Sequence, residues 1–153
     1  MKKLTHIDAR GQASMVDVST KPVSVRVATA GGEILLQRQT IRLIESNRIA
    51  KGNVLATARI AGIQAAKKTG DLIPLCHPLP ITHCEIEFEI PKSRDRIRIL
   101  GSAKITAQTG VEMEALTAVT MAALTIYDMC KAVDKKMRIS NVRLIKKTKT
   151  AVI

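Results

Sequence analysis

The spacing of hydrophobic residues along the chain alternates between the two-residue period of strands and the longer period of helices. Residues 23–30 alternate valine with polar residues, which predicts a half-buried strand, and Gly31 and Gly32 follow. We expect the chain to turn at these glycines, to return as a strand over residues 33–38, and to form a short helix over residues 40–46.

Three later segments also have the period of strands. Residues 81–90 and 96–105 alternate hydrophobic and polar side chains and flank the turn sequence PKSRD, which predicts an antiparallel hairpin. Residues 137–145 predict a closing strand.

Two segments have helical spacing. The first begins after Asn53, a favourable N-cap residue, and ends before Gly70. The second covers residues 112–133, and the three-residue spacing of Thr109 and Glu112 at its start predicts a capping box.

Residues 71–80 contain three prolines, which exclude a regular helix or central strand and predict a stiff extended loop. The order of elements, with mostly antiparallel strands, predicts an α+β fold in which helices pack on one face of a sheet. The length of 153 residues fits one domain over residues 1–153, with tails over residues 1–12 and 147–153.

Composition narrows the classes of partner. The chain has 25 basic and 13 acidic residues, and its formal net charge of +12 favours a polyanionic partner. Phe88 and Tyr127 are its only aromatic residues, which disfavours a sheet that stacks RNA bases but leaves phosphate-only binding of duplexes open.

Three cysteines without CxxC spacing argue against a disulfide framework. Without a signal peptide or a run of roughly 20 apolar residues, we expect a cytoplasmic chain.

Charged residues lie at both ends of the 112–133 segment. Asp128 and Lys131 are three residues apart near its end, whereas Glu112 and Glu114 lie at its start. At about 1.5 Å rise per residue, Glu112 and Asp128 are roughly 24 Å apart. One small substrate cannot contact both, so a site that uses all four groups must combine opposite ends of two chains.

Asp128 lies among hydrophobic residues, where burial raises a carboxyl pKa and Lys131 lowers it, a combination suited to proton transfer. An exposed ion pair is the structural alternative. Lys51 lies just before the 53–69 helix, where it either extends into solvent or contacts an anion bound at the helix start.

The proline-rich loop places His77 beside Cys76, and a rigid loop suits an imidazole used for hydrogen bonding or acid–base chemistry. A structural histidine bonded to backbone carbonyls is the alternative. The other histidines and cysteines lack ligand spacing, which argues against zinc, and no carboxylate cluster predicts a metal cage.

Two long segments are specific enough to indicate a family. They read KGNVLATARIAGIQAAKKTGDLIPLCHPL and TGVEMEALTAVTMAALTIYDMCKAVDK. Both closely resemble the cyclic pyranopterin monophosphate synthase family (MoaC family) of molybdenum cofactor biosynthesis, and LTHID and MVDVSTKPVSVR near the N-terminus fit it too. The resemblance implies a ferredoxin-like α+β subunit in a homohexamer, a trimer of dimers with active sites at the dimer interface. It also implies a lyase that converts a cyclised dihydro derivative of GTP to cyclic pyranopterin monophosphate and releases pyrophosphate.

The resemblance assigns roles to individual residues. Asp128 matches the catalytic residue, with Lys131 and Lys51 as its partners. The segments that match the family's substrate contacts contribute Leu75, Cys76, His77, Glu112, Met113 and Glu114. The basic residues that we expect to bind phosphates are Lys21, Arg26, Arg38 and Lys67, although their convergence cannot be read from the sequence.

The resemblance is weaker at the C-terminal end. Family members commonly continue into a Gly- and Lys-rich tail, whereas this chain reads KKTKTAVI, and Lys146, Lys147 and Lys149 are the residues able to replace its charge. No cofactor is expected to be required, Mg²⁺ being able to enter with the triphosphate, and neither nucleic acid nor membrane is an expected partner. The rival functions are a phosphate-tracking nucleic-acid binder and a non-catalytic accessory scaffold.

Overall fold

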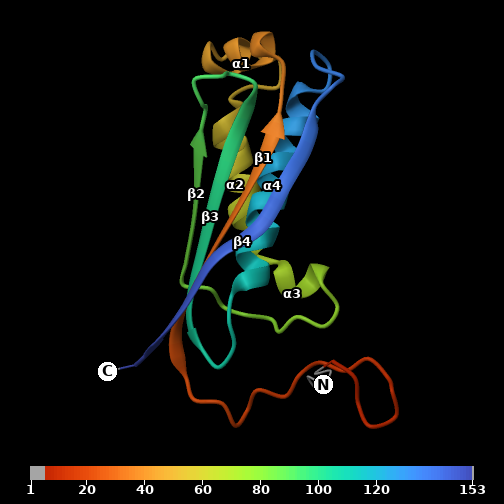
Figure 1. Ribbon diagram of the computed structural model, residues 1–153, viewed down its shortest axis with the longest axis vertical. Helices are drawn as coiled ribbons and strands as arrows, with labels where there is room; N and C mark the ends of the chain where they lie inside the picture. Colours follow the sequence, from red (N-terminus) through yellow and green to blue (C-terminus); the bar gives the residue numbers. More distant parts are fainter. Residues whose placement is uncertain (1–5, 153) are drawn as a thin grey trace.

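A four-stranded antiparallel sheet with the strand order β2-β3-β1-β4 forms one layer of the molecule, and α2 and α4 cover one of its faces (Figure 1). The computed structural model describes residues 6–152. The elements are β1 (Ser24–Leu35), α1 (Arg38–Glu45), α2 (Val54–Lys67), α3 (Thr69–Leu72), β2 (His83–Glu89), β3 (Arg96–Ala107), α4 (Glu112–Cys130) and β4 (Arg138–Ala151). The predicted α+β class is confirmed. With α1, α2 and α3 all in the connection between β1 and β2, the arrangement follows the β-α-β-β-α-β order of ferredoxin-like folds.

The core lies between the sheet and the two long helices. Small residues on α4, including Ala115, Ala118 and Ala122, are completely buried and let α2 approach closely. On α2, Gly62 has no room for a side chain, because a Cβ atom there would lie 2.7 Å from the carbonyl oxygen of Ala118. The α2–α4 pair is therefore closely packed, and α4 runs between the α1 end and the α3 end of the molecule (Figure 1).

The predicted turn at Gly31 and Gly32 is wrong, because β1 continues through both residues. The glycines serve packing rather than turning. A Cβ atom on Gly31 would lie 2.6 Å from Cδ1 of Ile145, and one on Gly32 would lie 2.9 Å from Cγ1 of Val119. Both partners are distant in sequence, so the local pattern gave a misleading turn signal.

Other local predictions are confirmed. The side chain of Asn53 caps α2 by accepting a hydrogen bond from the backbone N–H of Ala56. The hairpin consists of β2 and β3, which pair antiparallel, and β4 is the closing strand. β4 runs through Ala151, so residues 147–151, which the sequence assigned to a tail, belong to the sheet.

The capping box at the start of α4 is wrong. The N-cap residue is Val111, and its side chain makes no capping hydrogen bond. Glu112 is already the first residue of the helix, so it does not occupy the third helical position that a capping box needs. Its carboxylate instead bonds Nζ of Lys147 at 3.0 Å.

Within residues 6–152, none of the helices combines the length and hydrophobicity required to cross a membrane.

Candidate active site

The α1 end of the molecule carries a three-residue ion cluster. Asp128 lies in the last turn of α4. Nζ of Lys131 lies 2.7 Å from one of its carboxylate oxygens, and Nζ of Lys51 lies 2.7 Å from the other. Lys51 also donates to the backbone carbonyl of Asp128 at 3.2 Å. Gly52, with φ of 102°, permits the turn that brings Lys51 from the start of α2 to the end of α4.

The exposure of this cluster decides between the two interpretations of Asp128. Its side chain is 52% exposed, and those of Lys51 and Lys131 are 49% and 56% exposed. Of the two alternatives for Asp128, the exposed ion pair is therefore the one that the chain contains. Hydrogen bonds from Lys131 and then Lys51 lower the pKa of Asp128 to about 2, and the carboxylate raises the pKa of Lys131. Asp128 and Lys131 are thus charged at neutral pH.

The α3 end carries a hollow instead of an exposed cluster. The proline-rich loop, the start of α4 and the N-terminal segment line it together, and its volume is about 310 Å³. The predicted residues that it brings together are Lys21, Leu75, Cys76, His77, Glu112, Met113 and Glu114. Seven residues from three separate segments thus converge: the six that the resemblance matches to substrate contacts, and Lys21, one of the four residues expected to bind phosphates.

Glu114 and Cys76 have unusual environments at this end. Glu114 is only 3% exposed, and burial raises the pKa of its carboxyl, with a smaller contribution from Glu112. Burial, followed by the charge of Glu114, also raises the pKa of the Cys76 thiol. A raised pKa disfavours the thiolate, which argues against Cys76 as a nucleophile.

His77 connects the loop to the N-terminal segment. Its Nε2 lies 2.7 Å from the carbonyl oxygen of Val16, a pairing in which Nε2–H donates. The backbone contact of the structural alternative is therefore present. Because Nε2 carries the proton, Nδ1 of a neutral His77 ring has none and can accept a hydrogen bond.

A second, basic hollow adjoins the first. Arg26, Lys147 and Lys149 line it, and it shares Gly110 and Glu112 with the larger hollow. Arg26 donates to the carbonyl oxygen of Gln108 at 3.1 Å, which places its guanidinium beside the start of α4.

The two remaining predicted phosphate-binding residues lie apart from these hollows. Lys67 lines a smaller hollow with Asp71 and Pro78 near the α3 end, whereas Arg38 begins α1 at the other end of the molecule (Figure 1). One chain therefore does not bring the predicted site residues together. It divides them between ends that the length of α4, about 28 Å at 1.5 Å per residue, keeps apart.

Asp134 was missed by the sequence reasoning and lies buried in the turn that follows α4. It is 1% exposed and accepts hydrogen bonds from the backbone N–H of Gln37 at 2.8 Å and the hydroxyl of Thr40 at 3.0 Å. Burial alone would raise the pKa of Asp134, but the bonds from Gln37, Lys136 and Thr40 outweigh burial and lower it. Asp134 thus joins α1 to the turn that follows α4. A lone aspartate in KAVDKK gives no sequence signal for this contact.

No group of three or more His, Cys, Asp or Glu residues in the described range 6–152 is arranged to hold a metal ion.

Comparison with known sequences decides the family. The profile of the MoaC family matches residues 15–150. The chain belongs to the MoaC family. It is 58% identical to the cyclic pyranopterin monophosphate synthase of Desulfitobacterium hafniense, over 95% of this chain and 89% of the relative. It is 54% identical to the synthase of Parvibaculum lavamentivorans, over 96% of this chain and 92% of the relative. For the cyclic pyranopterin monophosphate synthase 1 of Mycobacterium bovis, the identity is 57%, over 95% of this chain and 85% of the relative. The MoaC match includes both ends of α4, and hence the predicted residues at each end.

Proposed function

We propose that this chain, a MoaC-family lyase that makes cyclic pyranopterin monophosphate in molybdenum cofactor biosynthesis, builds each active site from two copies of itself. The substrate is a cyclised dihydro derivative of GTP, and pyrophosphate is the leaving group. The ion cluster of one copy meets the hollow at the α3 end of the other.

The observation that carries this proposal is the division of the predicted residues between the two ends of α4. The exposed Asp128 cluster has half of each side chain open to solvent, whereas the hollow that contains Glu114 lies at the other end of the helix. A two-fold axis across α4 would place the end of one helix beside the start of its copy. Such an interface generates two equivalent sites in each dimer.

The ion cluster suits proton transfer and charge stabilisation. Asp128 holds Lys51 and Lys131 with their ammonium groups on opposite carboxylate oxygens. In the proposed mechanism one ammonium group donates protons while the purine ring opens and the pyran ring closes. The other stabilises negative charge on the departing pyrophosphate.

The hollow suits binding of the base and the sugar. The raised pKa of Glu114 favours its protonated carboxyl, which donates a hydrogen bond, and Nδ1 of His77 accepts one. Leu75, Cys76 and Met113 supply apolar contact. These groups position the ring system for the lysines of the other copy.

The triphosphate would lie toward the basic hollow. Arg26, Lys147 and Lys149 line that hollow, and Lys21 lines the neighbouring one. Lys67 lies at the same end of the chain, whereas Arg38 would reach the phosphates from the copy that supplies Asp128. Mg²⁺ is able to enter with the triphosphate, and we propose no resident cofactor. The dimers assemble further into a homohexamer, a trimer of dimers.

Incubation of the purified chain with the cyclised GTP derivative tests this function. Release of one pyrophosphate per cyclic pyranopterin monophosphate, without added protein, is the expected result. A non-catalytic scaffold would release none. A nucleic-acid binder would instead show affinity for unrelated duplexes that falls steeply with salt.

A further inference from the structure

Gly110 and Glu112 form the boundary between the two hollows at the α3 end. They are the residues that line both the hollow of about 310 Å³ and the basic hollow. Gly110 lies two residues before Glu112, the first residue of α4. It has no side chain with which to contact a substrate, so any role in the site must come from the space that it leaves.

The backbone conformation at position 110 does not require a glycine. Within residues 6–152, the glycines with positive φ are Gly11 and Gly52. Gly110 therefore lies outside the left-handed region, which is the usual reason for selecting a glycine. The reason for a glycine here lies in the atoms that surround it.

The nearest surroundings of Gly110 are a single carboxylate. A Cβ atom on Gly110 would overlap Oε2 of Glu112, and it would lie 2.8 Å from Cδ and 2.9 Å from Oε1 of the same side chain. The Glu112 side chain thus folds back into the space that a side chain at position 110 would occupy.

Other closely packed glycines of the chain meet backbone atoms instead. A Cβ atom on Gly62 would lie 2.7 Å from the carbonyl oxygen of Ala118, and one on Gly70 would lie 2.9 Å from Cα of Pro78. Substitution at those positions pushes packed segments apart, which is costly. At Gly110 it would move only the end of a flexible side chain, so the fold would be kept and the carboxylate displaced.

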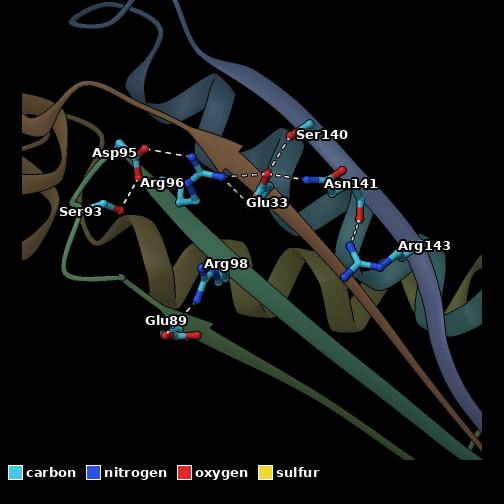
Figure 2. Close-up of polar contacts among 9 residues, drawn as sticks. All are labelled: Glu33, Glu89, Ser93, Asp95, Arg96, Arg98, Ser140, Asn141 and Arg143. Carbon is cyan, nitrogen blue, oxygen red and sulfur yellow. Dashed lines mark hydrogen bonds and ion pairs between the residues drawn. The ribbon is translucent and has the colours of Figure 1, made fainter.

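The position of the Glu112 carboxylate depends on this space because few donors hold it. Glu33, by contrast, accepts hydrogen bonds from three side chains of β3 and β4 (Figure 2). In the described part of the chain, the side-chain donor to Glu112 is Nζ of Lys147 alone, at 3.0 Å, and the Lys147 side chain is 66% exposed. An exposed ion pair restrains its partners weakly, so the shape of the boundary helps to decide where the carboxylate lies.

The folded-back carboxylate is coupled to a group in each hollow. Its Oε1 contacts Lys147 of the basic hollow, whereas Oε2 lies against Gly110 at the boundary. Its charge also contributes to the raised pKa of Glu114 in the larger hollow. A displacement of this one carboxylate would therefore be felt on both sides of the boundary.

We infer that Gly110 is a positioning residue for the lyase reaction, and that its missing side chain keeps the Glu112 carboxylate at the boundary of the two hollows. The inference rests on the proposed binding of the ring system in one hollow and of the triphosphate in the other. From the boundary, Oε2 accepts a hydrogen bond from the ring system or the sugar, and Oε1 holds Lys147 beside the phosphates. A side chain at position 110 would turn the carboxylate away from both.

A merely structural role for Gly110 is the alternative. The glycine would then only ease the passage of the chain into α4, and its replacement would act in the same way whatever residue stands at position 112. The two roles differ in whether the effect of the substitution depends on the Glu112 side chain.

A double-mutant cycle with Gly110→Ala and Glu112→Ala tests the inference. Initial rates of pyrophosphate release from the cyclised GTP derivative give kcat and KM for each variant. We expect either substitution alone to raise KM about tenfold, the loss typical of one hydrogen bond to a charged group, with little change in kcat. In the Glu112→Ala background, Gly110→Ala should cause no further rise, because no carboxylate is left for the new Cβ atom to displace.

Gly62→Ala is the matched control for a glycine that packs against backbone. Thermal melts should show a clearly lower Tm for Gly62→Ala, whereas the Tm of Gly110→Ala should stay close to that of the wild type. Circular dichroism checks that every variant folds.

The inference is overturned if Gly110→Ala has the wild-type KM, if its rise in KM persists in the Glu112→Ala background, or if it lowers the Tm as Gly62→Ala does. A wild-type KM in Gly110→Ala beside a raised KM in Glu112→Ala would sink the inference and leave the proposed function standing. A wild-type KM in Glu112→Ala would remove Glu112 from the site and the inference with it. The two-chain arrangement is decided separately, by turnover in mixed assemblies.

Discussion

The two ends of the molecule differ in the exposure and the ionisation of their carboxylates. At the α1 end, Asp128 and two lysines form an exposed cluster in which the carboxylate contacts both ammonium groups. At the α3 end, Glu114 is buried in the wall of a hollow where ionisation is disfavoured. Charged groups act most strongly on a substrate once water is excluded, and a hollow has little catalytic effect without proton donors. The difference therefore argues that each end is completed by the opposite end of another copy.

The largest expected effect is the loss of turnover in Asp128→Asn. The amide keeps the size of the side chain but removes the negative charge that holds Lys51 and Lys131 together. We expect kcat to fall by about 10²–10⁴-fold, the range typical of a lost acid–base group. Substrate binding should change little, because the hollow at the α3 end is intact. Initial rates of pyrophosphate release and the KM measure both effects.

The control for this variant is Glu45→Gln, which removes the charge of another exposed carboxylate paired with an arginine, Arg94. It is expected to keep wild-type turnover. Near-normal turnover in Asp128→Asn would remove the α1 end from the mechanism, and the comparison of the two ends would lose its basis.

The next largest effect is recovery of activity by mixing two inactive variants. Asp128→Asn lacks a working α1 end, and His77→Ala lacks a working α3 end. If each site combines opposite ends of two chains, random co-assembly should restore about one quarter of the wild-type sites. Turnover after joint unfolding and refolding, compared with separately refolded variants, is the measurement. Activity of the mixture equal to the sum of its parts would show that each chain works alone.

A smaller effect is expected from Glu114→Gln, which should increase stability at high pH but decrease turnover. Burial raises the pKa of Glu114 above its ordinary value of 4.5, so the folded chain binds this proton more tightly than the unfolded chain does. That stabilisation is present below pH 4.5 and is lost as the pH rises through the raised pKa. Removing the carboxylate should therefore raise the Tm at pH 8 while reducing turnover.

Melting curves from pH 4 to pH 8 check this prediction. The difference in Tm between Glu114→Gln and wild type should grow with pH. Glu112→Gln is the matched control, because its carboxylate is partly exposed and paired with Lys147. A Tm difference for Glu114→Gln that does not depend on pH would mean that the α3 end lacks the expected cost of ionisation.

The fold was predictable where the signal is local. The side chain of Asn53 caps its own helix, and the turn between β2 and β3 joins neighbouring strands, so short segments contained the information. The continuation of β1 through Gly31 and Gly32 was not predictable in this way. Its cause lies in Ile145 and Val119, which meet the glycines only after the sheet and α4 have assembled.

The candidate site follows the same rule. Lys131 could be paired with Asp128 from helical spacing alone. The contact of Lys51 with Asp128 joins residues 77 positions apart, and the bond from His77 to Val16 uses a backbone carbonyl that leaves no trace in side-chain patterns. The family resemblance supplied the residue identities, whereas the division of the residues between two ends followed from the length of one helix.

The smallest expected effect distinguishes a binding role at the α3 end from a structural one. Nζ of Lys147 lies 3.0 Å from the Glu112 carboxylate, and its side chain is 66% exposed. Exposed ion pairs contribute only about 0–1 kcal/mol to stability, so Lys147→Ala should leave the Tm almost unchanged. If the basic hollow binds the triphosphate, this variant should raise the KM several-fold with little change in kcat, and the dependence of KM on salt should weaken. Lys135→Ala, which removes an exposed lysine outside the basic hollow, provides the matched loss of one charge. Equal KM values for the two variants would place the triphosphate elsewhere and leave Lys147 as a surface partner of Glu112.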